Sequence, residues 1–279
     1  MTTGGSDTDQ DLIGWFAPPD LDLLFKAISR IENPGNIVLV GGQSLSFWVD
    51  HYDITIPQTD TPYLTQDADF LAGKNDAIAI SKLLGGEIKL ATLDDNTPNI
   101  ATLVFRGGAG NKLLIDFLGI IVGVDEGEIR KFAVPVERGE WRLNILHPIL
   151  CLKSRISNLC LLPSKRNKNG IEQARVAVEV AKYYLRDRIN EGSVRAALKT
   201  ANQIAELAQS RAGLYVWEKY GIDVLESIDP HLITVEKFQN VEWPRQIKMT
   251  ETRRDKVVKR KEQLEIRQQL KLHKTQFRR

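Results

Sequence analysis

Three aspartates interrupt stretches of the chain that are otherwise apolar. Asp67 and Asp69 lie in the run TQDADFLA, and Asp116 lies in the run KLLIDFLG. Side chains two residues apart in a strand point to the same side, so Asp67 and Asp69 are expected to project together. Neighbouring carboxylates repel one another unless a cation lies between them, and oxygen ligands suit Mg²⁺. If the strand of Asp116 pairs beside the first strand, the three carboxylates form a metal site suited to phosphoryl transfer.

A glycine-rich turn precedes the aspartates. In VLVGGQS, at 38–44, a short apolar run is followed by two glycines and a serine, and the next residues have a helical pattern. The N–H groups at the start of a helix favour a phosphate, and glycine permits its close approach. Gly41, Gly42 and Ser44 are therefore candidate phosphate ligands. Together with the aspartates they suit a nucleoside triphosphate bound with Mg²⁺, although each signal alone is more often an ordinary turn or strand end.

Periodicity predicts the elements that must position these residues. The expected elements are a helix at 20–33, a strand at 36–40, a helix at 41–52, a loop at 52–64, a strand at 65–72, a helix at 75–86, a strand at 87–91 and a hairpin at 99–119. The glycines of RGGAGNK are interpreted as the hairpin turn, since their spacing does not fit a P-loop. From His147 to about Tyr220 the pattern is helical, and a long charged helix follows from Pro244.

In this order, the motifs resemble the nucleotidyltransferase superfamily of the polymerase-β type. Within it the chain is most similar to minimal nucleotidyltransferases and to the AbiEii-like toxins of abortive-infection and toxin–antitoxin systems. The resemblance covers roughly residues 36–185, and LHPILCLKSRISNL resembles the AbiEii-like segment that contributes a lysine, here Lys153. It implies that Gly41, Gly42, Ser44 and Lys153 bind the nucleotide, ATP or another NTP. It also implies that Asp67, Asp69 and Asp116 bind Mg²⁺ or Mn²⁺ and are catalytic.

The pattern along the chain predicts an α/β (α+β) fold with flanking helices, followed by a helical second domain and a basic C-terminal helix. The resemblance implies that the mixed sheet of the first domain is of the nucleotidyltransferase type. The expected organisation is a mobile tail at 1–19, a catalytic domain at 20–146, a helical domain at 147–243 and a basic arm at 244–279. Two features depart from the family pattern. The 22 residues between Ser44 and Asp67 place an insertion, loop 50–64, near the site. The family's later Lys-Asp-x-x-Asp segment is incomplete, since only Lys168 and Glu172 match it and Asn169 stands in place of an acid.

The net charge of +2 conceals an uneven distribution. From Arg245 to Arg279 there are 13 basic and 4 acidic residues, whereas the other 244 residues carry a net charge of −7. A basic arm of this kind favours a polyanionic partner such as RNA or tRNA, and a solvated helix is an equal alternative. The candidate nucleic-acid contacts lie in this arm and in the loop at 163–170: Lys165, Arg166, Lys168, Arg253, Arg254, Lys259, Arg260 and Lys261.

The remaining composition points to a cytoplasmic protein with no membrane partner. The N-terminus is polar and lacks the pattern of a signal peptide, and the longest apolar run is broken by Asp116. Cys151 and Cys160 lie nine residues apart on one predicted helix, and we interpret them as buried thiols.

Three functions are consistent with these patterns. The first is an Mg²⁺-dependent enzyme that transfers a nucleoside monophosphate from an NTP to an acceptor hydroxyl of RNA, tRNA or protein. Such an enzyme could act as a toxin or defence effector with a cognate antitoxin. The second is a non-catalytic module of the same fold that binds nucleic acid or a partner protein, which the incomplete later motif favours. The third is a nucleotidyltransferase that modifies a small molecule of the antibiotic type.

Overall fold

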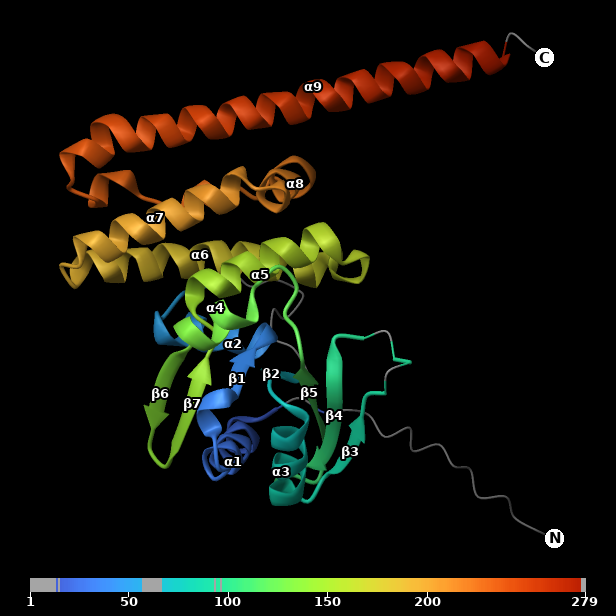
Figure 1. Ribbon diagram of the computed structural model, residues 1–279, viewed down its shortest axis with the longest axis vertical. Coiled ribbons are helices and arrows are strands. Elements are labelled where there is room, and N and C mark those ends of the chain that lie inside the picture. The colour runs from blue at the N-terminus through green and yellow to red at the C-terminus, as the bar shows by residue number, and fades with distance from the viewer. Residues whose placement is uncertain (1–13, 15, 57–66, 93, 96, 277–279) are drawn as a thin grey trace. The chain divides into compact units, whose positions relative to one another are not determined.

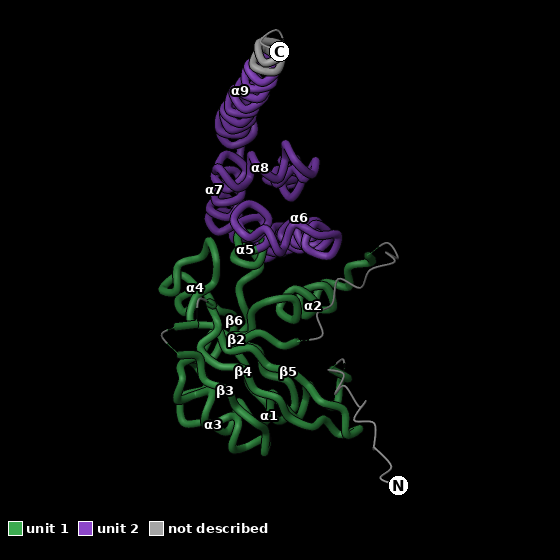
Figure 2. Tube along the Cα trace, turned by 90° about the vertical axis from the view of Figure 1, so that its right-hand side faces the viewer, with its two compact units in different colours: residues 1–154 green, residues 155–279 purple. Residues whose placement is uncertain are grey.

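The computed structural model describes residue 14 and residues 16–56, 67–92, 94–95 and 97–276. The predicted N-terminal tail falls largely outside these residues, and so does most of the predicted insertion at 50–64. The chain forms two compact units, Met1–Ser154 and Arg155–Arg279, which are coloured separately in Figure 2. The boundary falls within helix α5 (Pro148–Leu161). No helix among the described residues combines the length and the apolar character needed to cross a membrane.

The first unit is built on a seven-stranded mixed sheet with helices packed against it, which confirms the predicted α/β class (Figure 1). The strand order is β3-β4-β5-β2-β1-β7-β6, with β2 parallel to β5 and β1 parallel to β7. The strands are β1 (Val38–Val40), β2 (Ala68–Leu71), β3 (Glu87–Leu90), β4 (Asn99–Arg106), β5 (Lys112–Leu118), β6 (Val134–Arg138) and β7 (Trp141–Ile145). The helices before α5 are α1 (Pro18–Ser29), α2 (Gly41–His51), α3 (Lys74–Leu84) and α4 (Glu126–Phe132).

Alternation along the strands divides the central sheet into two chemically different faces. Leu39 pairs with Phe70, and Phe70 pairs with Phe117, so these buried side chains share one face. Helices α1, α2 and α3 contact the strands of this sheet, and Leu39 lies against residues of α1 and α2. Because successive side chains point to opposite faces, Asp69 and Asp116 lie on the other face. The apolar core therefore fixes the direction in which the acidic side chains project.

The predicted hairpin of β4 and β5 is confirmed, and a buried carboxylate holds its glycine turn. Gly110 has a φ of +82°, in the left-handed region that glycine adopts without strain. The backbone N–H of Gly108 donates to Asp20 Oδ1 over 2.9 Å, and the N–H of Ala17 donates to Asp20 Oδ2 over 3.1 Å. Asp20 thus links the start of α1 to the turn, which agrees with a structural role for RGGAGNK.

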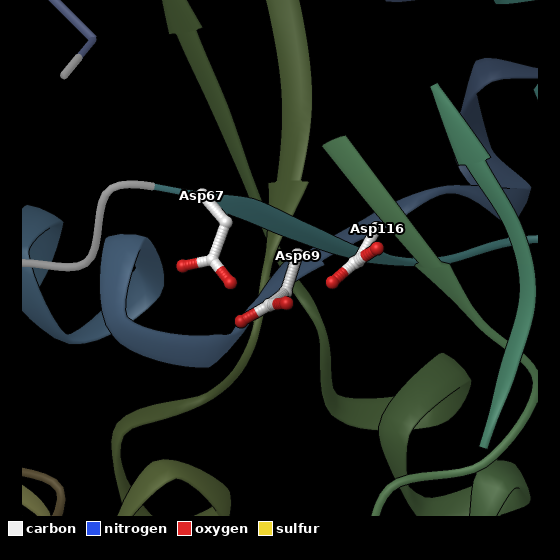
Figure 3. A group of neighbouring side chains, drawn as sticks. All are labelled: Asp67, Asp69 and Asp116. Atoms are coloured by element: carbon white, nitrogen blue, oxygen red, sulfur yellow. The ribbon is translucent and has the colours of Figure 1, made fainter. Parts of the chain in front are cut away.

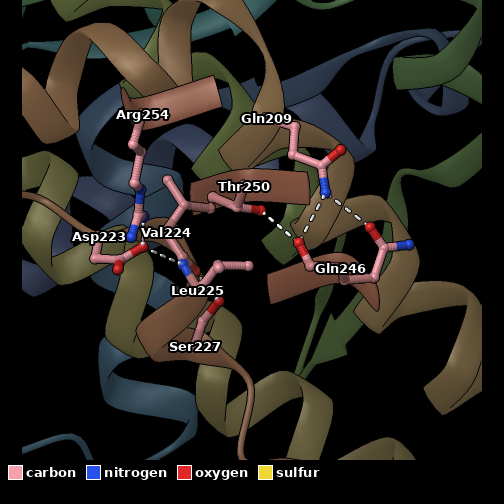
Figure 4. A network of polar contacts seen from close by, with 8 residues as sticks. All are labelled: Gln209, Asp223, Val224, Leu225, Ser227, Gln246, Thr250 and Arg254. Atoms are coloured by element: carbon pink, nitrogen blue, oxygen red, sulfur yellow. Dashed lines mark hydrogen bonds and ion pairs between the residues drawn. The ribbon is translucent and has the colours of Figure 1, made fainter. Parts of the chain in front are cut away.

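The second unit consists of helices, as the pattern after His147 predicted. They are α6 (Lys168–Asn190), α7 (Val194–Gln209), α8 (Arg211–Tyr220) and α9 (Trp243–Gln276), with short 3₁₀ turns between α8 and α9. Side chains near the start of α9 are tied to this unit (Figure 4): the Gln209 amide donates to Gln246 Oε1 over 2.7 Å, and Arg254 pairs with Asp223. Farther along α9, residues 258–269 are exposed.

Two elements of the first unit have no counterpart in the sequence-based prediction. Helix α4 and strand β6 occupy 126–138, between the predicted hairpin and strand β7. Both are short, and β6 is a largely exposed edge strand with Pro135 in it, so the alternation of apolar and polar residues is weak. Cys151 and Cys160 are buried free thiols on α5, as expected.

Candidate functional site

Asp67, Asp69 and Asp116 converge on one face of the first unit's sheet (Figure 3). One carboxylate oxygen from each residue lies within 4.8 Å of the others, and all three side chains are half-buried. Three oxygen ligands at this separation could hold a divalent cation, because hard cations take carboxylate oxygens. The predicted convergence of the three aspartates is therefore confirmed.

Strand pairing explains why carboxylates so far apart in the chain meet. Asp69 of β2 is the direct register partner of Asp116 in the parallel strand β5, so the two side chains stand side by side. Asp67 immediately precedes β2, and its two-residue separation from Asp69 keeps it on the same side. The Asp69 backbone also pairs with Val40, the last residue of β1, which brings the start of α2 next to the carboxylates.

Thr102 is a site residue that the sequence analysis missed. It lies on β4 directly opposite Asp116, and its Oγ1 donates a hydrogen bond to Asp116 Oδ1 over 3.0 Å. The bond fixes the orientation of the carboxylate. The sequence did contain a signal for Thr102: apolar and polar residues alternate along this strand, and Thr102 is the polar residue between the buried Ala101 and Leu103.

Gly41 is in direct contact with the acidic group. Its φ is +68°, and a Cβ added to it would lie 1.8 Å from Asp69 Oδ2. No other residue type fits this position without moving the carboxylate. Helix α2 begins at Gly41 itself, with no intervening turn, so its N–H-bearing end lies beside the carboxylates. Gly42 follows in the first turn and is buried.

Ser44 and Lys153 form bonds with other protein groups. Ser44 is fully buried, and its hydroxyl donates to the carbonyl of Gly41 over 3.0 Å and lies 3.5 Å from Cys151 Sγ. Lys153 of α5 is half-exposed, and its Nζ donates to Glu128 Oε2 of α4 over 2.6 Å. The structure therefore brings Gly41 to the aspartates, whereas the hydroxyl of Ser44 points into the protein.

All of the predicted basic contacts except Arg254 are exposed, and several of them also bond to other protein groups. Arg166 donates to the carbonyls of Leu159 and Cys160, at 3.0 and 2.8 Å, and so closes the end of α5. Lys165 and Lys168 are exposed. In α9, three of the predicted contacts bond to other parts of the second unit, although Arg253 and Lys261 are also exposed. The bonded side chains are Arg253 (to the Gln209 carbonyl, 2.8 Å), Arg254 (to Asp223, 2.5 Å) and Lys261 (to Glu218, 2.8 Å), and Lys259 and Arg260 are exposed as well.

Comparison with known proteins yields no functional assignment. No family model matches the chain, and no curated protein does. Among solved structures, the chain is similar to JHP933 from Helicobacter pylori, with 13% identity over 89% of this chain and 94% of that chain and a TM-score of 0.35. A likeness at that level carries no argument about fold or function.

Proposed function

We propose that the protein is an Mg²⁺-dependent nucleotidyltransferase. The observation that supports this proposal is the convergence of Asp67, Asp69 and Asp116 within 4.8 Å beside the glycine start of α2. Carboxylate oxygens suit a divalent cation, and the start of a helix suits a phosphate. A nucleoside triphosphate bound with Mg²⁺ would satisfy both groups at once.

Each residue has a specific role in this proposal. Asp67, Asp69 and Asp116 would hold the cation, and the backbone of Gly41 and Gly42 would face the phosphates. When bound, the divalent ion would neutralise charge that develops on the phosphoryl oxygens. The hydrogen bond from Thr102 holds the Asp116 carboxylate in place, so Asp116 would act as the third metal ligand or as the base that accepts the proton of the acceptor hydroxyl.

The acceptor hydroxyl belongs to RNA, tRNA or protein in this proposal. The resemblance to AbiEii-like toxins supports a defence or toxin role with a cognate antitoxin. The exposed Lys259 and Arg260 support a nucleic-acid acceptor, because exposed basic side chains can contact phosphates.

A non-catalytic binding module is the second candidate. Two predicted nucleotide ligands are bonded within the protein, since Ser44 donates to Gly41 and Lys153 pairs with Glu128. Without these donors, a nucleotide would bind through the metal and the backbone alone. This observation favours binding without efficient transfer.

An assay with labelled nucleotides separates the two candidates. The full chain is incubated with each α-labelled NTP, Mg²⁺, total RNA and a bacterial protein extract, and label transfer and pyrophosphate release are measured. Transfer that is lost in Asp69→Asn and Asp116→Asn and retained in the exposed control Asp94→Asn supports the enzyme. Metal-dependent nucleotide binding without transfer supports the binding module, and the absence of both excludes each candidate.

A further inference from the structure

A cavity of about 380 Å³ lies between α1 and α2, on the apolar side of the sheet. The lining residues run from Pro18 to Phe25 in α1 and from Gln43 to Asp50 in α2, at intervals of three and four residues in both helices. This spacing places each set on one helical face, so the two helices face each other across the cavity. Leu39, whose side chain is on the face opposite Asp69, also lines it. The cavity is therefore separate from the three aspartates.

The walls of the cavity are aromatic and are held in place by their neighbours. Phe25 packs edge-on against Trp141, with ring centroids 5.0 Å apart, and both side chains are buried. Phe47 packs edge-on against Trp48, with ring centroids 5.1 Å apart. Protein interiors leave few voids larger than a water molecule, and ligand pockets measure about 300–1,000 Å³. The size and the fixed aromatic walls are those of a preformed ligand pocket.

Two opposite charges line the same cavity without pairing. Within the part of the chain that the structure describes, neither the Asp50 carboxylate nor the Arg138 guanidinium has a hydrogen bond or ion pair. Both residues are exposed at the surface. Partial desolvation nevertheless raises the pKa of Asp50, and the attraction of Arg138 only partly opposes this rise. Asp22, the other acidic residue of the lining, differs because it pairs with Lys26 over 3.0 Å. The cavity thus offers one acceptor and one donor of full charge above an apolar wall.

We propose that this cavity binds an apolar α-amino acid in its zwitterionic form. The ammonium group lies beside Asp50, the carboxylate lies beside Arg138, and the side chain packs against Phe25, Phe47 and Trp141. Guanidinium and carboxylate groups match in geometry, and charge-assisted hydrogen bonds are stronger than neutral ones. A ligand with a single charge pairs with only one of the two side chains, Asp50 or Arg138, and a nucleobase offers only neutral groups to both. The zwitterion satisfies both charges.

Titration calorimetry of the full chain with L-phenylalanine tests this proposal. L-Phenylalanine is expected to bind saturably, whereas phenylalaninamide, without the carboxylate, and N-acetylphenylalanine, without the ammonium, bind about 10-fold more weakly. Asp50→Asn is expected to weaken the binding of L-phenylalanine about 10-fold and to leave the binding of N-acetylphenylalanine unchanged. Arg138→Gln is expected to weaken the binding of L-phenylalanine and to leave the binding of phenylalaninamide unchanged. Thermal melts of each variant establish that it is folded.

Asp22→Asn is the matched control, because Asp22 lines the same cavity and already has a partner. It is expected to change L-phenylalanine binding less than about 3-fold, and Asp69→Asn, on the other sheet face, is expected to leave binding unchanged. Equal losses in Asp22→Asn and Asp50→Asn would overturn the assigned roles. The absence of saturable binding by L-phenylalanine, L-leucine and L-tryptophan would overturn the proposal, and so would binding of guanosine or adenosine that displaces L-phenylalanine.

Discussion

The backbone of Gly41 lies so close to the Asp69 carboxylate that no side chain fits at position 41. A Cβ at position 41 would lie 1.8 Å from Asp69 Oδ2. The start of α2 and the candidate metal ligand Asp69 are therefore in direct contact. Each substitution at this contact tests the proposed site directly.

Gly41→Ala is expected to weaken divalent-metal binding at least about 10-fold, because the added methyl group displaces the Asp69 carboxylate. It also places alanine at a φ of +68°, which costs roughly 1–2 kcal/mol of stability. Metal affinity is measured by calorimetry, and stability by urea unfolding.

Gly85→Ala separates the two effects. Gly85 has a φ of +66°, and a Cβ there would meet nothing within 4 Å, so this variant carries the backbone strain without the clash. It should lose stability and keep its metal affinity. If Gly85→Ala and Gly41→Ala impair metal binding equally, the contact with Asp69 is irrelevant to the site.

Thr102→Val is expected to weaken divalent-metal binding roughly 2- to 10-fold, because one hydrogen bond contributes about 0.5–1.5 kcal/mol. Valine keeps the shape of threonine and removes only the donor to Asp116 Oδ1. Thr102→Ser retains a hydroxyl and should largely restore affinity. Identical metal affinities for the serine and valine variants would contradict the positioning role.

Asp50→Asn is expected to raise the melting temperature at neutral pH and to have less effect in acid. Burial raises the pKa of Asp50 above its ordinary 3.8, so ionisation costs the folded state more than the unfolded state. This cost is present above the raised pKa and disappears as the pH falls below 3.8, where both states bind the proton. Melting curves from about pH 3 to about pH 8 measure the difference. A gain that is independent of pH would show that the carboxylate's ionisation is not its source.

Arg254→Met is expected to destabilise the second unit by about 1–3 kcal/mol, because it leaves Asp223 without its cation. The two side chains are only 15% and 24% exposed, and the Arg254 guanidinium also lies 4.8 Å from the centre of the Trp217 ring. Arg260→Met, an exposed position on the same helix, is the control and should change stability little. Urea unfolding of both variants tests the expectation, which fails if they are equally stable.

Deletion of residues 262–279 is expected to leave the melting temperature unchanged. Residues 262–269 are exposed, and among the side chains that the structure describes, Lys261 is the last in α9 that bonds to another part of the unit. If the arm contacts nucleic acid, the same deletion should flatten the salt dependence of RNA binding, by about 0.7 in log–log slope for each lost phosphate contact on a single strand. Affinity is measured over a salt series. An unchanged slope would remove the support for a nucleic-acid partner at this end.

The sequence by itself determined the local features of the site. Alternation with a period of two placed Asp67 and Asp69 on one side, and the glycines at 107–110 indicated the hairpin that β4 and β5 form. The start of α2 at Gly41 and the long charged helix α9 were also predictable, because helical periodicity and glycine punctuation act over a few residues. These patterns depend on local conformation, and they were sufficient to predict the α/β fold class.

Only the tertiary structure decided which distant residues meet. The parallel register of β2 and β5 sets Asp116 beside Asp69, and the neighbouring register of β4 sets Thr102 against Asp116. The rotation of α2 buries the hydroxyl of Ser44, which the motif alone had assigned to a phosphate. Likewise, α4 supplies Glu128 to Lys153. Strand register and helix rotation are chosen by burial of the whole apolar face, and no local window of sequence contains that information.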